Sequence, residues 1–367
     1  MREYLLTLLV AAGATYLLVA LMGKLAYLVG AVPPTRDRDV HRKPVPRLGG
    51  LAMLGGLLAG MLVASYLPRM SVRVIEQSDD ARALLTAAAV ICLVGVIDDI
   101  WGLSALAKFA GQLLAGGLLV VQGVQLFWLP TPSGGTLALD QTQGAILTVL
   151  LVVGTANAVN FIDGLDGAAA GVVGIGAAAF FSYAYLLAVE GGFSRLTTSA
   201  LVMAVLCGMC AGFLPHNVYP ARIFMGDSGA MLIGLLLAAG SISLTGSFPT
   251  TPESATLLVA LLPLLLPLAV IALPFTDLLM AVFRRTRAGR SPFAPDKQHL
   301  HHRLLEMGHS HVRAVFLLWT WAALVAFGLV VIAFIGGWAA PVLIGVAIVV
   351  TVLVTTGHPR AVFGNSR

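Results

Sequence analysis

The chain alternates long apolar runs with short polar segments along almost its whole length. A membrane-spanning helix needs about 20 mostly apolar residues, and eleven runs approach that length. We predict spans at roughly 4–23, 48–67, 83–97, 106–127, 145–158, 168–189, 199–214, 230–245, 257–281, 314–335 and 338–355. The third and fifth runs are the weakest, and buried half-spans are an alternative for them. The pattern predicts an all-α, polytopic membrane protein with about eleven transmembrane helices, forming a single domain over residues 1–367.

Composition supports the membrane class. Hydrophobic residues make up 58% of the chain and charged residues 11%, whereas a soluble globular protein has about 25% charged residues. The first run follows Arg2 directly, and we interpret it as a retained helix because ten further apolar runs follow it.

Lysine and arginine residues gather in alternate loops. The loops 34–47 and 282–313 contain five and seven of them, and one side of the predicted topology carries sixteen in total against five on the other. The positive-inside rule makes the richer side cytoplasmic. We therefore expect a multi-pass protein of the inner (plasma) membrane, with the N-terminus outside and the C-terminus inside.

Three acidic motifs stand at the ends of predicted spans, all on the cytoplasmic side. "GVIDDIWG" ends the third span with Asp98 and Asp99, "NAVNFIDGLDG" carries Asp163 and Asp166, and "FMGDSG" places Asp227 before the eighth span. Ionisable groups at a bilayer are costly and usually functional. Five carboxylates near one membrane face predict a hard cation such as Mg²⁺, which keeps several waters and contacts substrate phosphates.

Each motif also has a purely structural interpretation. The D-G-L-D-G pattern is typical of a tight turn, and its glycines would let the backbone approach a ligand. Asp227 could cap the eighth span, although a helix N-terminus is also an anion site. The pair Asp98–Asp99 lies at a helix C-terminus, where the helix dipole disfavours anions. We therefore expect a positive group to offset that pair.

Two basic segments lie on the same side. "DKQHLHHRLL" contains His299, His301, His302 and Arg303, and the cations beside these histidines favour phosphate or sugar contact over zinc. The first loop, "HRKPVPRLGG", fits either attraction to anionic lipid or capture of a phosphate. Together the features indicate phosphoryl transfer between a soluble donor and a lipid acceptor. The Walker phosphate-binding loop is absent from the sequence, and we expect no nucleic-acid partner.

Four segments in this order resemble the polyprenyl-phosphate N-acetylhexosamine-1-phosphate transferases: "GVIDDIWGLSALAKF", "NAVNFIDGLDGAAAG", "RIFMGDSGAMLIG" and "DKQHLHHRLL", within residues 41–305. The form "HLHHRLL" is similar to the branch that acts on UDP-N-acetylglucosamine (UDP-GlcNAc). The resemblance implies that a polyprenyl phosphate attacks the β-phosphate of a UDP-N-acetylhexosamine, releasing UMP and leaving a lipid-linked sugar. Membrane lipid and a second copy of the chain, as a homodimer, are the partners implied.

The resemblance also implies a role for each matching residue. Asp227 would be the principal ligand of Mg²⁺ (or Mn²⁺), and Asp98, with Asp99 beside it, would orient or deprotonate the lipid phosphate. The remaining implied roles are phosphate binding for Lys108; the nucleotide and metal site for Asn157, Asn160 and Asp163; the uracil edge for Gly164, Leu165 and Asp166; ring stacking for Phe224; and pyrophosphate or sugar contact for His299, His301, His302 and Arg303. The metal set would be Asp227, Asp98, Asp99 and Asp163, and the catalytic set Asp98, Asp99, Asp163 and Asp166.

Other classes remain open at this point. The peptidoglycan branch of the same family uses a UDP-muramoyl-pentapeptide and typically has three consecutive histidines where Leu300 interrupts them here. An ion-coupled transporter would place its ionisable residues near mid-span, and a CDP-alcohol phosphotransferase would need Ala-Arg after the first Asp-Gly. A purely structural membrane protein leaves the acidic motifs unexplained.

Overall fold

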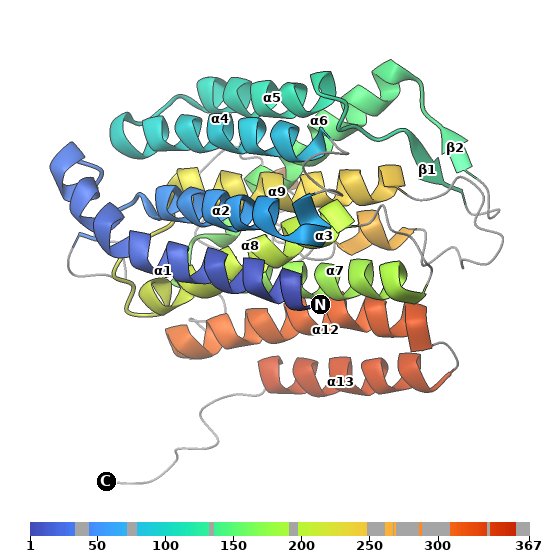
Figure 1. Cartoon of the computed structure of the whole chain (residues 1–367). Coiled ribbons are helices and arrows are strands. Elements are labelled where there is room, and N and C mark those ends of the chain that lie inside the picture. Colours follow the sequence, from blue (N-terminus) through green and yellow to red (C-terminus); the bar gives the residue numbers. More distant parts are fainter. Residues whose placement is uncertain are drawn as a thin grey trace, which may run out of the picture.

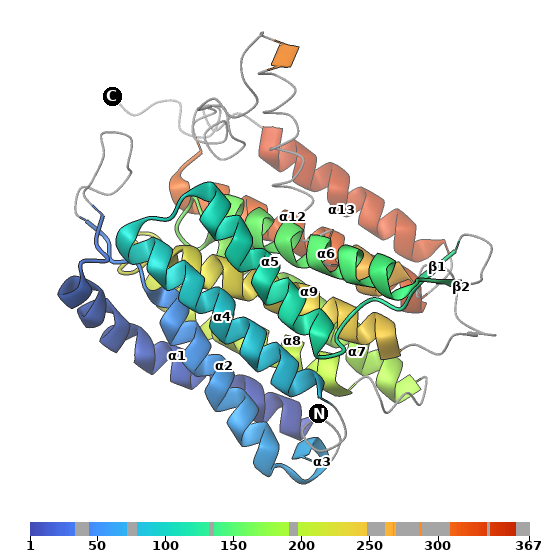
Figure 2. The same ribbon diagram turned by 90° about the horizontal axis from the view of Figure 1, so that it is seen from above.

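The computed structural model describes residues 1–33, 44–71, 79–131, 136–190, 197–247, 261–266, 268, 286–287, 309–335 and 338–356. Its named elements are α1 (Arg2–Val29), α2 (Gly49–Tyr66), α3 (Pro68–Met70), α4 (Asp80–Trp101), α5 (Ala105–Val121), β1 (Trp128–Pro130), β2 (Thr136–Ala138), α6 (Gln141–Ile162), α7 (Ala168–Glu190), α8 (Thr197–Asn217), α9 (Gly226–Ser247), α12 (His311–Ile335) and α13 (Ala339–Thr356). The long helices run side by side in one bundle (Figure 1), and the view from above shows the same alignment (Figure 2).

The helices confirm the predicted all-α, polytopic membrane architecture. Within the described residues, eight helices are long and apolar enough to cross a membrane, while α5 and α13 are shorter apolar helices. The third and fifth predicted runs form the 22-residue helices α4 and α6 rather than half-spans. The predicted span at 257–281 lies mostly outside the described residues.

Local signals explain where two of the helices begin and end. Asp140 and Gln143 form a reciprocal capping box at the start of α6, which satisfies backbone donors that the first turn would otherwise leave free. The predicted span 106–127 is too long, because α5 ends at Val121 and the chain turns at Gly123, where φ is 91°. The residues that follow lead into the antiparallel hairpin of β1 and β2, which the sequence analysis did not predict.

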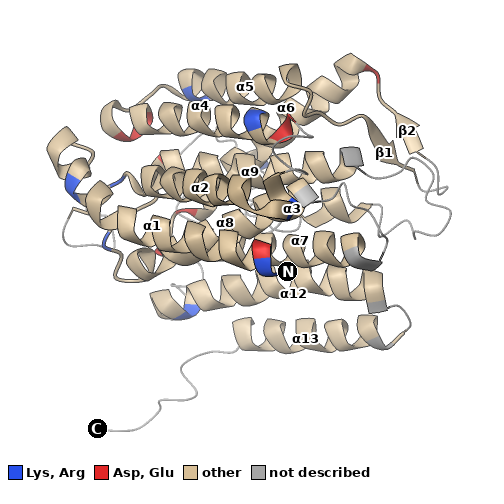
Figure 3. Cartoon of the chain, in the orientation of Figure 1, with Lys and Arg blue, Asp and Glu red and all other residues tan. Residues whose placement is uncertain are grey.

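Helix α9 lies at the centre of the bundle. Of its most apolar stretch, 94% of the residues are buried inside the protein, against 22% for α1 and 33% for α12. Helices α2, α4, α6 and α8 all pack against α9. Charged residues are sparse along the helices and lie mainly near their ends (Figure 3). A polar group on α9 therefore reaches solvent only at the helix ends, and Asp227 stands in its first turn.

Candidate active site

The C-terminal end of α4 meets the N-terminal end of α9. Asp99 accepts hydrogen bonds at Oδ1 from the Asp227 amide (2.9 Å) and at Oδ2 from the amide and the hydroxyl of Ser228 (3.1 and 2.7 Å). A carboxylate of one helix thus caps the N-terminus of another, where the helix dipole favours negative charge. Gly226 is required at this junction, because its φ is 69° and a Cβ atom there would collide with the Asp99 carboxylate.

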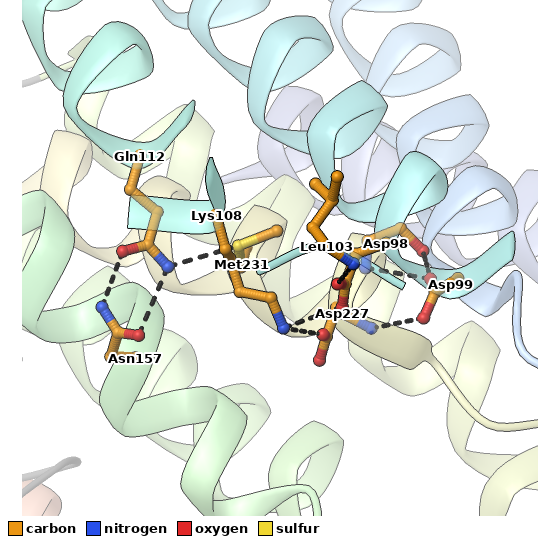
Figure 4. Close-up of polar contacts among 9 residues, drawn as sticks. Asp98, Asp99, Leu103, Lys108, Gln112, Asn157, Asp227 and Met231 are labelled. Carbon is orange, nitrogen blue, oxygen red and sulfur yellow. Dashed lines mark hydrogen bonds and ion pairs between the residues drawn. The ribbon is translucent and has the colours of Figure 1, made fainter. Parts of the chain in front are cut away.

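Lys108 is the positive group that the acidic end of α4 was expected to need. Its ammonium nitrogen lies 2.7 Å from Asp98 Oδ2 and also contacts Asp227 Oδ2 (Figure 4). The second oxygen of Asp98 accepts a hydrogen bond from the Leu103 amide at 2.7 Å. We call Asp98, Asp99, Lys108 and Asp227 the charged cluster. One ammonium faces two carboxylates here, so this part of the site carries a net negative charge.

Asp163 adds a further carboxylate beside the cluster. It directly follows α6, where its amide donates to the Val159 carbonyl, and its side chain is half-buried. Burial raises the pKa of Asp163 well above its usual value, and the negative charges of Asp227 and Asp99 raise it further, while Arg47 acts in the opposite direction. The electrostatic surroundings of Asp163 therefore favour either a proton or an incoming cation.

The carboxylates of the site fit a magnesium ion whose coordination shell is completed by substrate phosphates. Within the described ranges, no three Asp, Glu, His or Cys side chains are grouped so that they could hold a metal by themselves. Mg²⁺ is usually bound by one or two carboxylates and fills its shell with waters and substrate phosphates. Asp227 and Asp163 offer hard oxygen donors in surroundings that disfavour two adjacent negative charges.

An amide pair lies one helical turn deeper than Lys108. The Gln112 amide nitrogen donates to Asn157 Oδ1 at 3.3 Å, and Asn157 Nδ2 donates back to Gln112 Oε1 at 2.7 Å (Figure 4). Asn157 also donates to the Val153 carbonyl at 2.8 Å. The pair joins α5 to α6 below the charged cluster, and it occupies polar groups of Asn157 that were expected to face the nucleotide.

Residues 163–167, which we call the glycine turn, are fixed by hydrogen bonds between side chains and backbone groups. Asp166 Oδ2 accepts from the Ala221 amide at 2.9 Å. Asn217 Oδ1 accepts from the Gly167 amide at 3.0 Å, and Asn217 Nδ2 donates to the Ile223 carbonyl at 3.0 Å. Both Asp166 and Asn217 are buried. These contacts join the glycine turn to the segment between α8 and α9, so Asp166 has a structural contact in addition to the catalytic role implied for it.

The first basic loop reaches the same place. The Phe224 amide donates to the Pro46 carbonyl at 2.9 Å, and the Phe224 carbonyl accepts from the Gly49 amide at 3.1 Å. This parallel contact brings Arg47 beside Phe224, and Arg47 is exposed. A basic side chain and an aromatic ring, both predicted as parts of a phosphate and nucleotide site, therefore border the charged cluster.

The structure brings some predicted residues together and places others elsewhere. Asp98, Asp99, Lys108 and Asp227 are in direct contact. Gly164 is exposed and Asn160 is partly buried. The Leu165 side chain is only 4% exposed and packs in an apolar cluster with residues of α12, so the predicted contact of Leu165 with a uracil would have to be made by its backbone. His299, His301, His302 and Arg303 lie outside the described residues.

The sequence analysis missed four residues that hold the site: Gln112, Asn217, Ser228 and Trp319. Gln112 had a usable signal, since it is an amide in an apolar run four positions after Lys108 and so lies on the same helix face. Asn217 and Ser228 adjoin recognised motifs but look like ordinary helix-end residues. The Trp319 indole nitrogen donates to the Gly167 carbonyl at 3.1 Å. Trp319 stands in a predicted span where a tryptophan is unremarkable, and nothing in the sequence indicates this contact.

Comparison with known proteins gives a consistent set of relatives. A sequence profile described as glycosyl transferase family 4 matches residues 81–245. The chain is 46% identical over 359 residues, 97% of its length and 88% of the relative's, to decaprenyl-phosphate N-acetylglucosaminephosphotransferase of Mycolicibacterium smegmatis. It is 48% identical over 332 residues to the protein of that name in Mycobacterium leprae, covering 89% and 83% of the two chains. A phospho-N-acetylmuramoyl-pentapeptide-transferase of Desulforudis audaxviator is 31% identical over 345 residues, 86% of this chain and 95% of the other.

Proposed function

Since the chain belongs to the glycosyl transferase family 4 proteins that include the polyprenyl-phosphate N-acetylglucosaminephosphotransferases, we propose that it transfers N-acetylglucosamine 1-phosphate from UDP-GlcNAc to a polyprenyl phosphate. An oxygen of the lipid phosphate bonds to the β-phosphorus of UDP-GlcNAc. The bond between that phosphorus and the bridging oxygen breaks, and UMP leaves. The product is a polyprenyl-pyrophosphoryl sugar, the first lipid-linked intermediate of an envelope glycan.

One observation carries this proposal. Three helices direct Asp98, Lys108 and Asp227 into direct contact at one end of an otherwise apolar bundle. A charged group placed at the end of a membrane bundle can meet a water-soluble nucleotide and a lipid headgroup at once. A transporter would instead need its ionisable groups along a path across the bilayer.

The residues divide the work of bringing two anionic substrates together. Lys108 would neutralise phosphate charge, and Asp98, held by the Leu103 amide, would orient the attacking lipid phosphate. Asp227 and Asp163 would hold Mg²⁺, which, when bound, neutralises charge on the phosphate oxygens. Phe224 and the exposed Gly164 would border the nucleotide. The histidine segment 299–303 would face the pyrophosphate or sugar, as the resemblance implies.

Orientation and assembly follow the same proposal. The charged cluster lies at the helix ends that the distribution of Lys and Arg assigns to the cytoplasm, where UDP-sugars are made. We therefore propose a plasma-membrane location with the active site facing the cytoplasm, the N-terminus outside and the C-terminus inside. The homodimer implied by the resemblance stays a prediction.

The choice of donor favours N-acetylglucosamine. The chain is 46% identical to a relative named for that sugar and 31% identical to one named for the muramoyl-pentapeptide. The interrupted histidine segment, in which Leu300 separates two histidines from the third, agrees with this choice.

The deciding experiment uses the purified full-length protein in nanodiscs with decaprenyl phosphate and Mg²⁺. With UDP-GlcNAc we expect one UMP for each lipid-linked sugar formed, and we expect chelation by EDTA to stop both. UDP-muramoyl-pentapeptide and UDP-N-acetylgalactosamine serve as competing donors. Release of UMP without a lipid product, or turnover only with another donor, would refute the proposed reaction or the proposed donor.

A further inference from the structure

The glycine turn is held by two other helices at a single residue, Gly167. Gly167 has a φ of 79°, a conformation that glycine adopts at little cost. Its amide donates to Asn217 of α8, as described above, and its carbonyl accepts from the indole nitrogen of Trp319 in α12 at 3.1 Å. The same carbonyl also accepts the first helical bond of α7, from the Gly171 amide at 3.1 Å.

Apolar packing surrounds the hydrogen bond from α12. Leu165 within the turn and Ala168 directly after it form a separate buried cluster with Ala314, Val315 and Leu317 of α12. Gly171 provides the room for the indole, because a Cβ atom there would collide with Trp319. The contact is therefore built from both partners, and Figure 1 shows α12 lying along α7.

Helix α12 follows all the segments from which the site was recognised. The family profile ends at residue 245, and the four motif segments end near residue 305, so Trp319 lies beyond every feature that identified the site. The glycine turn begins with Asp163, whose side chain borders the charged cluster. A displacement of about 1 Å in a group that positions substrates can cost about 10²-fold in rate.

We propose that Trp319 is a positioning residue: its indole N–H fixes the Gly167 peptide and thereby sets where Asp163 and Gly164 stand relative to the charged cluster. The proposal rests on the transferase function only for its kinetic readout. Helix α12 thus serves the active site as well as the apolar packing of the bundle.

The test removes the indole N–H of Trp319 while keeping an aromatic ring at that position. Trp319→Phe removes the donor and keeps an aromatic side chain in the buried cluster. The matched control is Trp321→Phe in the same helix, because the Trp321 indole nitrogen donates instead to Thr355 Oγ1 of α13 at 3.3 Å. Both variants lose one indole hydrogen bond, but only one of these bonds reaches the glycine turn.

Two measurements follow, and only one depends on activity. For Trp319→Phe we expect kcat to fall about three- to tenfold, the change that corresponds to one hydrogen bond, with the KM for decaprenyl phosphate unchanged. We also expect amide hydrogen exchange in peptides covering residues 163–171 to accelerate by about the same factor. Trp321→Phe should change neither quantity.

Each outcome is decisive. If Trp319→Phe matches the wild type in exchange, or if exchange rises while kcat stays the same, the positioning role is wrong. If both variants lose activity equally, the effect belongs to the packing of α12 and not to the bond with Gly167. If the wild-type protein shows no transfer from UDP-GlcNAc, the proposed function fails, while the exchange data still report on the Trp319 contact.

Discussion

The two parts of the candidate site are held together by different forces. In the charged cluster, Asp99 uses both oxygens to bind the start of α9, and Lys108 joins Asp98 to Asp227. In the glycine turn, the Asn217 amide and the Trp319 indole hold the Gly167 backbone, and the Asp166 carboxylate accepts from the Ala221 amide. Among the described residues, no hydrogen bond to the Asp163 side chain is found. An ammonium paired with carboxylates fixes the first part, while hydrogen bonds between side chains and backbone groups fix the second and leave the Asp163 side chain available for a ligand.

The largest effect should come from a carboxylate that faces the substrates. Asp227→Asn keeps the size of the side chain and an oxygen for Lys108 but removes the charge that would hold Mg²⁺. We expect turnover to fall by about 10³-fold or more, because metal stabilisation of phosphate charge contributes several kcal/mol. UMP release from UDP-GlcNAc measures this change.

The matched control lies at the other end of the same two helices. Asp80 of α4 accepts a hydrogen bond from Ser243 of α9 at 2.8 Å, and Asp80→Asn should leave turnover within about twofold, because Asp80 lies at the opposite end of α4 from the charged cluster. Equal losses of turnover in Asp227→Asn and Asp80→Asn would mean that the effect comes from weakening the contact between α4 and α9, and not from losing a carboxylate that faces the substrates.

A smaller effect is expected where a carboxylate holds structure. Asp99→Asn places an NH₂ group against backbone N–H donors, so at least one donor at the start of α9 loses its partner. We expect the free energy of unfolding to fall by about 1–3 kcal/mol, seen as a lower melting temperature in detergent. Turnover should fall by about tenfold to 100-fold through displacement of Asp227.

This variant also sharpens the comparison within the charged cluster. If Asp99 is a metal ligand as first predicted, Asp99→Asn will lose as much turnover as Asp227→Asn without a lower melting temperature. Ser228→Ala, which removes one of the three donors to Asp99, provides the intermediate case.

The smallest of the three effects is expected at the glycine turn. Asn217→Ala removes two neutral hydrogen bonds from a buried side chain, at a cost of about 1–2 kcal/mol in the free energy of unfolding. Turnover should fall by less than about tenfold, since no charge that meets a substrate is lost. Ser182→Ala, which removes a bond to the Ala178 carbonyl within α7, controls for a lost hydrogen bond elsewhere. A loss as large as that of Asp227→Asn would show that the glycine turn matters more than its neutral contacts suggest.

The sequence allowed the architecture and the meeting of the acidic motifs to be predicted. Apolar length alone located most helices, and counting spans placed the ends of α4 and α6 and the start of α9 at the same face. The dipole argument at Asp98 and Asp99 also predicted a positive group, and Lys108 supplies it.

The rest depended on packing that a one-dimensional pattern does not encode. Which way Asp99 turns is decided by the close approach of α4 and α9. Leu165 is buried because α12 covers the glycine turn, and a leucine beside two aspartates carries no sign of that cover. Trp319 finds its partner about 150 residues away in the chain, a separation over which hydrophobic periodicity gives no pairing information.

The central place of α9 has a consequence for how the protein is made. Its neighbours α2, α4, α6 and α8 all precede it in the chain, and synthesis begins at the N-terminus. The helix that brings Asp227 is therefore synthesised after these four neighbours. Until it arrives, Asp99 lacks the donors of Asp227 and Ser228 and Lys108 can pair only with Asp98, so a nascent chain released before residue 226 would carry an acidic helix end with nothing to close it.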